Sequence, residues 1–214
     1  MRRYIFRAQI KLGLEDKAVS ALSEYSTVFN NYVSKRELLT ASCFHWGRNI
    51  FLYYEVIQSD IEPGSTFQGL EQYLETWAGE NFSRYWVPML DIYHADYPVT
   101  NEYWERNWKA KSIGKVIRLK PEMAASYIFY HYQYQEEKPG DWAKYALITI
   151  YENLLFFYLE EPDGPVQSPY KGKLNTSDSP QSQWGQLMGE HFMPWEDSKG
   201  PDDNWREVDL IFRV

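Results

Sequence analysis

The chain has 214 residues and ordinary globular proportions, 24% charged and 44% hydrophobic, but 18% of its residues are aromatic, with 9 Trp and 18 Tyr. Its formal net charge of -8 argues against a nucleic-acid partner, because binding a phosphate backbone draws on clustered Lys and Arg. The single cysteine, Cys43, excludes an intramolecular disulfide and a thiolate metal cluster, and the lack of a long apolar run predicts a soluble, cytoplasmic protein with no membrane partner.

The first half of the chain reads as a strand, a helix and a strand pair. Residues 3–10 are rich in aromatic and β-branched residues with strand-like alternation. Residues 14–33 carry apolar side chains three and four positions apart, which is the spacing of an amphipathic helix. Residues 39–57 give two β-rich runs broken by a Gly-Arg-Asn turn, the composition of a hairpin. Helical spacing returns at 66–78, and 82–92 is expected to continue as a helix or helix-turn.

A second round in the same order begins near residue 115. A short strand leads to Pro121, which suits the first turn of a helix, and 143–160 forms another strand pair turning at Glu152-Asn153. Letters repeat as well as order, since Ile10 and Ala18 recur as Ile117 and Ala125, each 107 positions later. These matches indicate an internal duplication.

The duplication predicts two halves, 1–111 and 112–214, with a long exposed loop at 163–183 that is dense in Pro, Gly, Ser and Asp. Each half has the elements of a ferredoxin-like α+β unit, whose sheet leaves one face uncovered by helices. We therefore expect an α+β fold in which two ferredoxin-like repeats are fused into a single-chain version of the dimeric α+β barrel. In solution the chain is expected to be a monomeric pseudo-dimer or a weak homo-oligomer.

Tyr127 and His131 are the first candidate site residues. Four positions apart on a helix, their side chains lie on one face and can converge on one ligand, although packing of both rings in a core is the commoner outcome for a His beside apolar residues. An imidazole that titrates near neutrality can donate or accept a proton. Trp195 and Asp197 form a second candidate, because carboxylates beside an indole can recognise sugar hydroxyls, although such residues at a helix end are often a solvated cap.

Several short motifs resemble the L-rhamnose mutarotases, small proteins built from one such unit that form dimers. The Tyr127 and His131 pair matches a Tyr and His four residues apart on the first helix of that family. Residues 48–55 resemble its hairpin, with Arg-Asn before an apolar strand that ends in Glu. Arg84-Tyr85-Trp86, followed by Asp91, is similar to its late helix.

The resemblance implies interconversion of sugar anomers by acid/base chemistry, with no metal and no organic cofactor. His131 would then be the proton donor, with Tyr127 beside it. The side chains implied to hold the sugar are Tyr145, Tyr85, Trp86 and Asp91, with Trp195 and Asp197 added from their chemistry. The expected partner is a small-molecule sugar.

The first repeat departs from this pattern, because it has Ser20 and Glu24 where the second has Tyr127 and His131. The sequence therefore predicts one site centred on His131, or none. Whether the protein is an enzyme stays open. The alternatives are a non-catalytic sugar or small-molecule binding protein on the same scaffold and a cofactor-free monooxygenase-like α+β barrel protein. Phosphate-loop and dinucleotide fingerprints are absent from the sequence.

Overall fold

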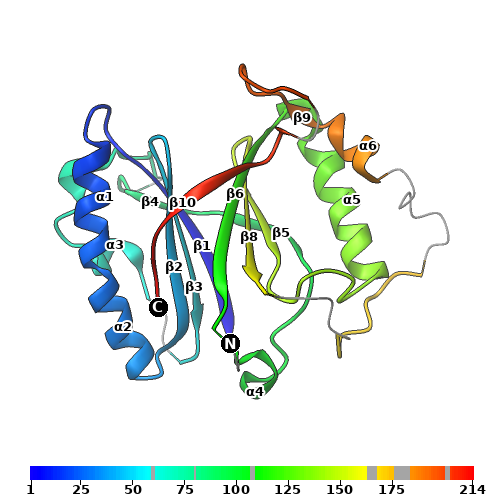
Figure 1. The fold of residues 1–214 in the computed structure, drawn as a ribbon, viewed down its shortest axis with the longest axis horizontal. Helices are drawn as coiled ribbons and strands as arrows, with labels where there is room; N and C mark the ends of the chain where they lie inside the picture. Colours follow the sequence, from blue (N-terminus) through cyan, green and yellow to red (C-terminus); the bar gives the residue numbers. More distant parts are fainter. Residues whose placement is uncertain (59–60, 80, 107–108, 163–167, 176–183, 201–202) are drawn as a thin grey trace. The chain divides into compact units, whose positions relative to one another are not determined.

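The computed structural model shows a chain that folds into two compact units (Figure 1). Unit 1 comprises Met1–Met89, Pro98–Asn107 and Val208–Val214, and unit 2 comprises Leu90–Tyr97 and Trp108–Glu207. The structure describes residues 1–214 except 59–60, 80, 107–108, 163–167, 176–183 and 201–202.

The sheet of unit 1 is antiparallel, with strand order β4, β1, β3, β2, β10. Its strands are β1 (Arg2–Gln9), β2 (Leu38–Trp46), β3 (Asn49–Val56), β4 (Trp86–Pro88) and β10 (Arg206–Arg213). The predicted first strand and the predicted hairpin are both confirmed. Gly47 has a φ of 56° in the hairpin turn, a conformation that glycine adopts at little cost.

Helices α1 (Glu15–Glu24) and α2 (Ser26–Ser34) run along the unit 1 sheet (Figure 1). The single helix predicted over 14–33 is thus divided at Tyr25. The other helical elements among the described residues of unit 1 are short: α3 (Pro63–Thr66), the 3-10 helix η1 (Glu71–Tyr73) and α4 (Asn101–Trp104).

The prediction of a helix over 82–92 is wrong, because this segment forms β4 and then β5 (Leu90–His94). Trp86, Val87 and Pro88 pair with β1, and pairing of this kind overrides local helical spacing. Pro88 also lacks the N–H that a helix interior would need. The prediction of a helix over 66–78 is wrong as well. Only Thr66, at the end of α3, and η1 are helical there, and the segment instead forms β-bridges from Leu74 to Ile10 and from Trp77 to Arg84.

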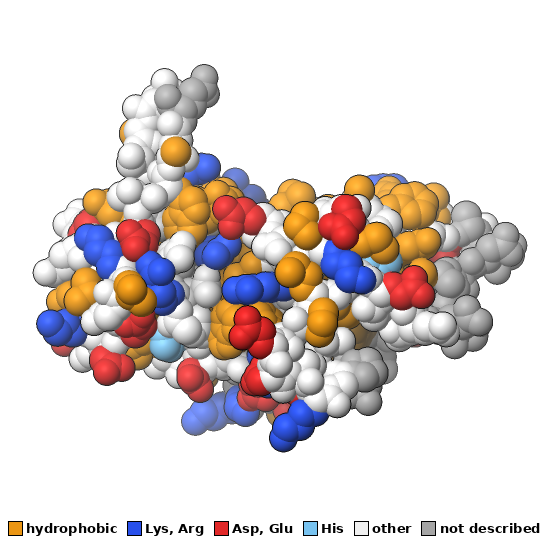
Figure 2. Space-filling view, turned by 90° about the horizontal axis from the view of Figure 1, so that it is seen from above, with side chains coloured by type: hydrophobic (Ala, Val, Ile, Leu, Met, Phe, Trp, Pro, Cys, Tyr) orange, Lys and Arg blue, Asp and Glu red, His pale blue; other side chains and the backbone are white. Residues whose placement is uncertain are grey.

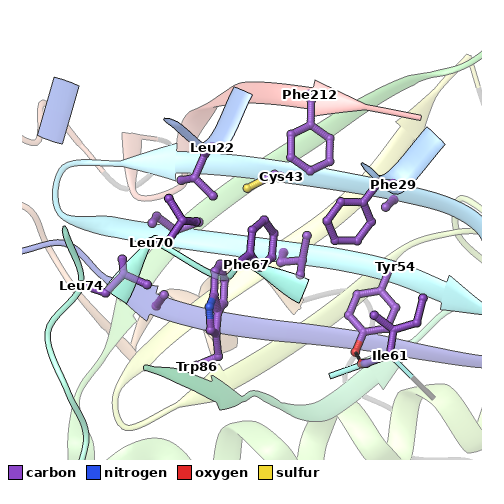
Figure 3. Packing of buried hydrophobic residues seen from close by; sticks show 14 of the residues in the cluster. Leu22, Phe29, Cys43, Tyr54, Ile61, Phe67, Leu70, Leu74, Trp86 and Phe212 are labelled. Carbon is purple, nitrogen blue, oxygen red and sulfur yellow. Dashed lines mark hydrogen bonds between the residues drawn. The ribbon is translucent and has the colours of Figure 1, made fainter. Parts of the chain in front are cut away.

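Aromatic rings and aliphatic side chains pack together in the core of unit 1 (Figure 3). Phe67 stacks on Trp86 with ring centroids 4.8 Å apart, and Phe29 contacts both Phe67 and Phe212 at 5.4 Å. The Tyr54 hydroxyl donates to the Ile61 carbonyl at 2.6 Å, which fixes the chain beyond β3 to the same core.

The sheet of unit 2 is also antiparallel, with strand order β6, β8, β7, β5 and the short β9 beside β6. Its further strands are β6 (Lys111–Leu119), β7 (Leu147–Tyr151), β8 (Leu154–Glu161) and β9 (Phe192–Met193). The predicted second hairpin is confirmed. The 3-10 helix η2 (Pro121–Met123) leads into α5 (Ala124–Glu137), which confirms a helix that starts at Pro121, and α6 (Trp184–Gly189) follows later.

Each unit contains one strand from the other half of the sequence. β5 follows β4 directly but pairs with β7 in unit 2, whereas Val208–Val214, most of β10, belongs to unit 1 and pairs with β2. Apart from this exchange, each unit has a strand, a helical segment and a hairpin in the same order. The predicted fold class, two ferredoxin-like α+β repeats in one chain, is confirmed.

The loop predicted at 163–183 lies partly outside the described residues. Its described part, 168–175, packs against other segments of unit 2: the Ser168 hydroxyl donates to Asp96 at 2.5 Å and the Tyr170 hydroxyl donates to Glu136 at 2.5 Å. On the face seen in Figure 2, acidic and basic side chains are interspersed. Within the described part of the chain, no helix is long and apolar enough to cross a membrane.

Candidate functional site

Helix α5 brings Tyr127 and His131 together on the face that packs against the unit 2 sheet, where only 1% and 3% of their surfaces are exposed. The opposite face carries Phe129 and Tyr132, which are largely open to solvent. The i, i+4 spacing thus places both rings over the sheet, as the sequence predicted. Their ring centroids lie 4.1 Å apart.

The hydrogen bond of His131 defines the state of its ring. The Nδ1 atom lies 3.0 Å from the backbone carbonyl of Tyr127, and a carbonyl can only accept. Nδ1 therefore carries the proton in the neutral imidazole, and Nε2 keeps a lone pair that can accept a proton. Tyr93 and Trp184 meet the ring edge-on, with centroids at 5.7 and 5.1 Å.

Burial lowers the pKa of His131 to about 4, an effect that the Tyr127 carbonyl opposes and nearby His191 reinforces. Burial likewise raises the pKa of the Tyr127 phenol well above its ordinary value. At neutral pH the site therefore holds a neutral imidazole beside a neutral phenol.

This low pKa predicts a loss of stability in acid. The unfolded chain binds a proton at His131 near pH 6.5, whereas the folded chain does so only near pH 4, so stability falls as the pH drops between these values. The expected loss attributable to His131 is about 3 kcal/mol. Urea unfolding of wild type and His131→Phe between pH 7 and 4 measures it. If the free energy of unfolding falls equally steeply with pH in the two proteins, the acid-induced loss of stability does not come from His131.

A pocket of about 470 Å³ opens beside His131, between α5, α6 and the sheet of unit 2. Three indole rings line it, those of Trp142, Trp184 and Trp205. Aliphatic and other aromatic side chains from the sheet, α6 and β9 complete much of the wall: Ile148, Phe157, Met188 and Phe192. Among the described lining residues, Lys115 alone carries a formal charge at neutral pH.

His191 fastens α6 to α5 and so holds one wall of the pocket in place. Its Nδ1 lies 2.8 Å from the Leu187 carbonyl, and its Nε2 lies 2.9 Å from the Ser126 hydroxyl on α5. In a neutral His191, Nδ1 donates to that carbonyl and Nε2 is an acceptor, so the single Ser126 hydroxyl proton is shared between Nε2 and the Met123 carbonyl, which lies 3.0 Å from the hydroxyl. The Tyr127 ring contacts both imidazoles, with the His191 centroid at 5.8 Å.

Tyr93 on β5 has a buried hydroxyl that finds no hydrogen-bond partner in the described structure, with 1% of the residue exposed. Leaving such a group unpaired costs about 1–3 kcal/mol. We therefore expect Tyr93→Phe, which keeps the ring that contacts His131 and Trp142, to raise the free energy of unfolding by about 1 kcal/mol. Urea unfolding measures the change, and a loss of stability would indicate a bound water at this hydroxyl.

The other predicted site residues of unit 2 have partners of their own. Tyr145 is fully buried with the Lys144 ammonium 5.4 Å from its ring centroid, and Asp91 accepts a hydrogen bond from His94 at 2.9 Å. The Trp195 indole donates to the Asn204 carbonyl at 2.7 Å. The exposed Asp197 pairs with Arg206 at 2.9 Å. None of the predicted four is among the described residues that line the His131 pocket.

Tyr85 and Trp86 belong to unit 1. Trp86 is 6% exposed and stacks on Phe67 in the core, whereas Tyr85 lines a surface groove of about 430 Å³ together with Phe6 and Arg84. Neither residue lines the His131 pocket among its described walls. The structure thus joins only Tyr127 and His131 of the predicted set.

Sequence reasoning missed the three tryptophans and Lys115. The indoles come from positions 142, 184 and 205, so no local spacing links them. Lys115 did leave a signal, because it shares a strand face with Ile117 and lies opposite the buried Phe157. A lysine on the apolar face of a strand is an exception to the usual alternation.

A buried ion pair in unit 1 was also missed. The Glu55 side chain is fully buried and accepts hydrogen bonds from Arg106 at 2.7 and 2.8 Å, from the Trp104 indole at 3.0 Å and from the Tyr53 hydroxyl. Burial alone would raise the pKa of Glu55, but the Arg106 guanidinium and these donors together hold it below its ordinary value.

Among described residues no cluster of three His, Cys, Asp or Glu side chains suits a metal.

No family model matches this chain, and no curated protein matches it. Three solved structures are similar to it at low identity. One, named "Putative monooxygenase", from Fusobacterium nucleatum subsp. nucleatum, is 12% identical with a TM-score of 0.41 over 97% of this chain and 90% of that one. A second of the same name, from Lactobacillus acidophilus, is 7% identical with a TM-score of 0.43 over 99% and 94%. An anthrone oxidase-like protein is 6% identical with a TM-score of 0.38 over 99% and 92%.

Proposed function

We propose that the unit 2 pocket binds a planar, largely apolar aromatic compound, and that His131 removes a proton from it so that the resulting carbanion reacts with molecular oxygen. The observation that carries this proposal is the lining itself: three indoles and four other apolar side chains around one neutral imidazole. Aromatic side chains are a usual lining of pockets that bury an apolar ring system.

This lining offers a sugar few groups that can hydrogen-bond to its hydroxyls. Pockets that fix the orientation of a polyhydroxylated ligand do so with precisely placed polar groups. Among the described lining residues there is no carboxylate and no amide side chain, and the polar side chains are Lys115, Tyr127, His131 and the indole N–H groups. We therefore favour an aromatic oxidation over mutarotation.

The chemistry balances without an external reductant. In anthrone, a suitable probe, the methylene between two rings loses a proton to His131 Nε2, and the electron pair of the broken C–H bond delocalises as an enolate. The carbanionic carbon then forms a bond to dioxygen and a proton converts the product to a hydroperoxide. Cleavage of the O–O bond and loss of the second C–H proton release water and leave anthraquinone, so one dioxygen is consumed for each anthrone.

The buried state of His131 suits the role of a base. Its low pKa keeps Nε2 unprotonated throughout the neutral range, so the acceptor is always available. A negative charge that develops on the ligand beside the ring favours the imidazolium, and this raises the pKa of His131 during proton transfer. The bond from Nδ1 to the Tyr127 carbonyl holds the ring and stabilises the imidazolium as it forms.

The test has two stages. Anaerobic titration with anthrone should quench tryptophan fluorescence, and admission of oxygen should then yield anthraquinone faster than in buffer. A panel of monosaccharides should neither quench fluorescence nor show enhanced anomer exchange by saturation-transfer NMR. Enhanced exchange of any sugar, with no anthrone turnover, would replace this proposal by mutarotation.

A further inference from the structure

Lys115 is a cation placed against an aromatic pocket. It lies on β6, half-buried, on the sheet face that also carries Phe157 and Ile117, and its side chain lines the pocket beside His131. The side chain makes no hydrogen bond, ion pair or ring contact with any part of the chain that the structure describes.

Other lysines of unit 2 are placed differently. The ammonium of Lys120 donates to the Glu190 carbonyl at 2.7 Å, and those of Lys111 and Lys173 lie 3.8 Å from Glu207 and Glu136. A half-buried ammonium gains most from an anionic partner, because apolar walls weaken the screening by water. With His131 neutral, the described lining carries a net positive charge in a protein whose formal charge is -8.

We infer that the ligand of this pocket carries an acidic oxygen, a phenol or an enol, and that Lys115 binds this oxygen as the anion. The inference rests on the proposed function and narrows its substrate class from aromatic compounds to aromatic compounds with an ionisable oxygen. The same ammonium then stabilises the enolate oxygen that forms when a carbon acid loses its proton to His131.

Two matched probes distinguish recognition of a ligand's charge from recognition of its ring system. The chromophore 2-hydroxyanthraquinone ionises at its phenol, whereas 2-methoxyanthraquinone has the same ring system and cannot ionise. In wild type, the absorbance titration of the bound hydroxy probe should shift to lower pH than that of the free probe. A hydrogen bond to a charged group contributes enough for the hydroxy probe to bind about ten- to hundredfold more tightly than the methoxy probe at a pH where it is ionised.

Lys115→Met is expected to reduce this preference by about tenfold or more and to remove the titration shift. Lys111→Met removes the same charge from the same strand away from the pocket and should leave both readouts as in wild type. If wild type binds both probes equally, or if Lys115→Met keeps the preference, the inference about Lys115 fails while the aromatic pocket stands. If wild type binds neither probe, the proposed function fails and the inference falls with it.

Discussion

Replacing Arg106 by Met is expected to lower the free energy of unfolding by about 3–5 kcal/mol, because it leaves the Glu55 carboxylate buried without its cation. The side chains of Arg106 and Glu55 are 8% and 0% exposed, so the carboxylate is shielded from solvent and depends on this cation. The remaining donors, Trp104 and Tyr53, carry no charge. Urea unfolding at pH 7 measures the loss.

An ion pair on the protein surface with the same nitrogen–oxygen distance serves as the control. Arg36 and Glu105 also meet at 2.7 Å, but their side chains are 69% and 43% exposed, so Arg36→Met should cost less than about 1 kcal/mol. The double replacement Glu55→Gln with Arg106→Met should be more stable than Arg106→Met alone, because no charge stays buried. Equal losses for Arg106→Met and Arg36→Met would contradict the account of this ion pair.

The pH dependence of the pair has a definite sign. The pKa of Glu55 is lowered in the folded state, so its contribution to stability is present above the pKa of the unfolded carboxyl, about 4.3, and is lost as the pH falls through the folded value. In Arg106→Met, burial dominates and raises the pKa of Glu55. The stability difference between the variant and wild type should therefore narrow in acid.

Replacing His131 by Gln is expected to lower the rate of anthrone oxidation by about 10²- to 10⁴-fold, the contribution usual for a positioned general base. Glutamine keeps a polar side chain near the Tyr127 carbonyl but cannot accept the proton. The rate constant kcat/KM of wild type should fall only below about pH 4–5, because the pKa of His131 in the free protein is about 4. Stopped-flow absorbance of anthraquinone formation gives both quantities.

His94→Gln is the matched control. His94 lies on β5 of the same unit and pairs with Asp91, and it does not line the pocket among the described residues. Its replacement should leave the rate and the pH profile unchanged. A rate for His131→Gln within a few-fold of wild type would remove His131 from the reaction, even if the aromatic compound still binds.

Local patterns explain why much of the fold could be predicted. The alternation in β1, the turn at Gly47 and the spacing in α5 are set by nearby residues, and each predicted the element that forms. The segment at 82–92 was mispredicted because Trp86–Pro88 pairs with β1, about eighty positions away in the chain. The exchange of β5 and β10 between the sequence halves leaves no trace in local periodicity.

The site was predictable only in part, because local spacing does not predict contacts between residues far apart in the sequence. The i, i+4 spacing on α5 was sufficient to bring Tyr127 and His131 to one face. The three indoles of the pocket meet only after α6 and the segment before β10 pack on the sheet. The spacing of nearby residues in the sequence does not predict that packing. Trp86 carried a motif resemblance but stacks in the unit 1 core, so residue type alone did not distinguish a core ring from a pocket ring.

A crystal structure with bound anthraquinone tests the central claim most directly. The account predicts the ring system between α5, α6 and the unit 2 sheet, in contact with the indoles of Trp142, Trp184 and Trp205. One carbonyl oxygen should lie within hydrogen-bond distance of Lys115 Nζ, and the opposite edge should face His131 Nε2. Anthraquinone bound elsewhere, with this pocket empty, would contradict the account.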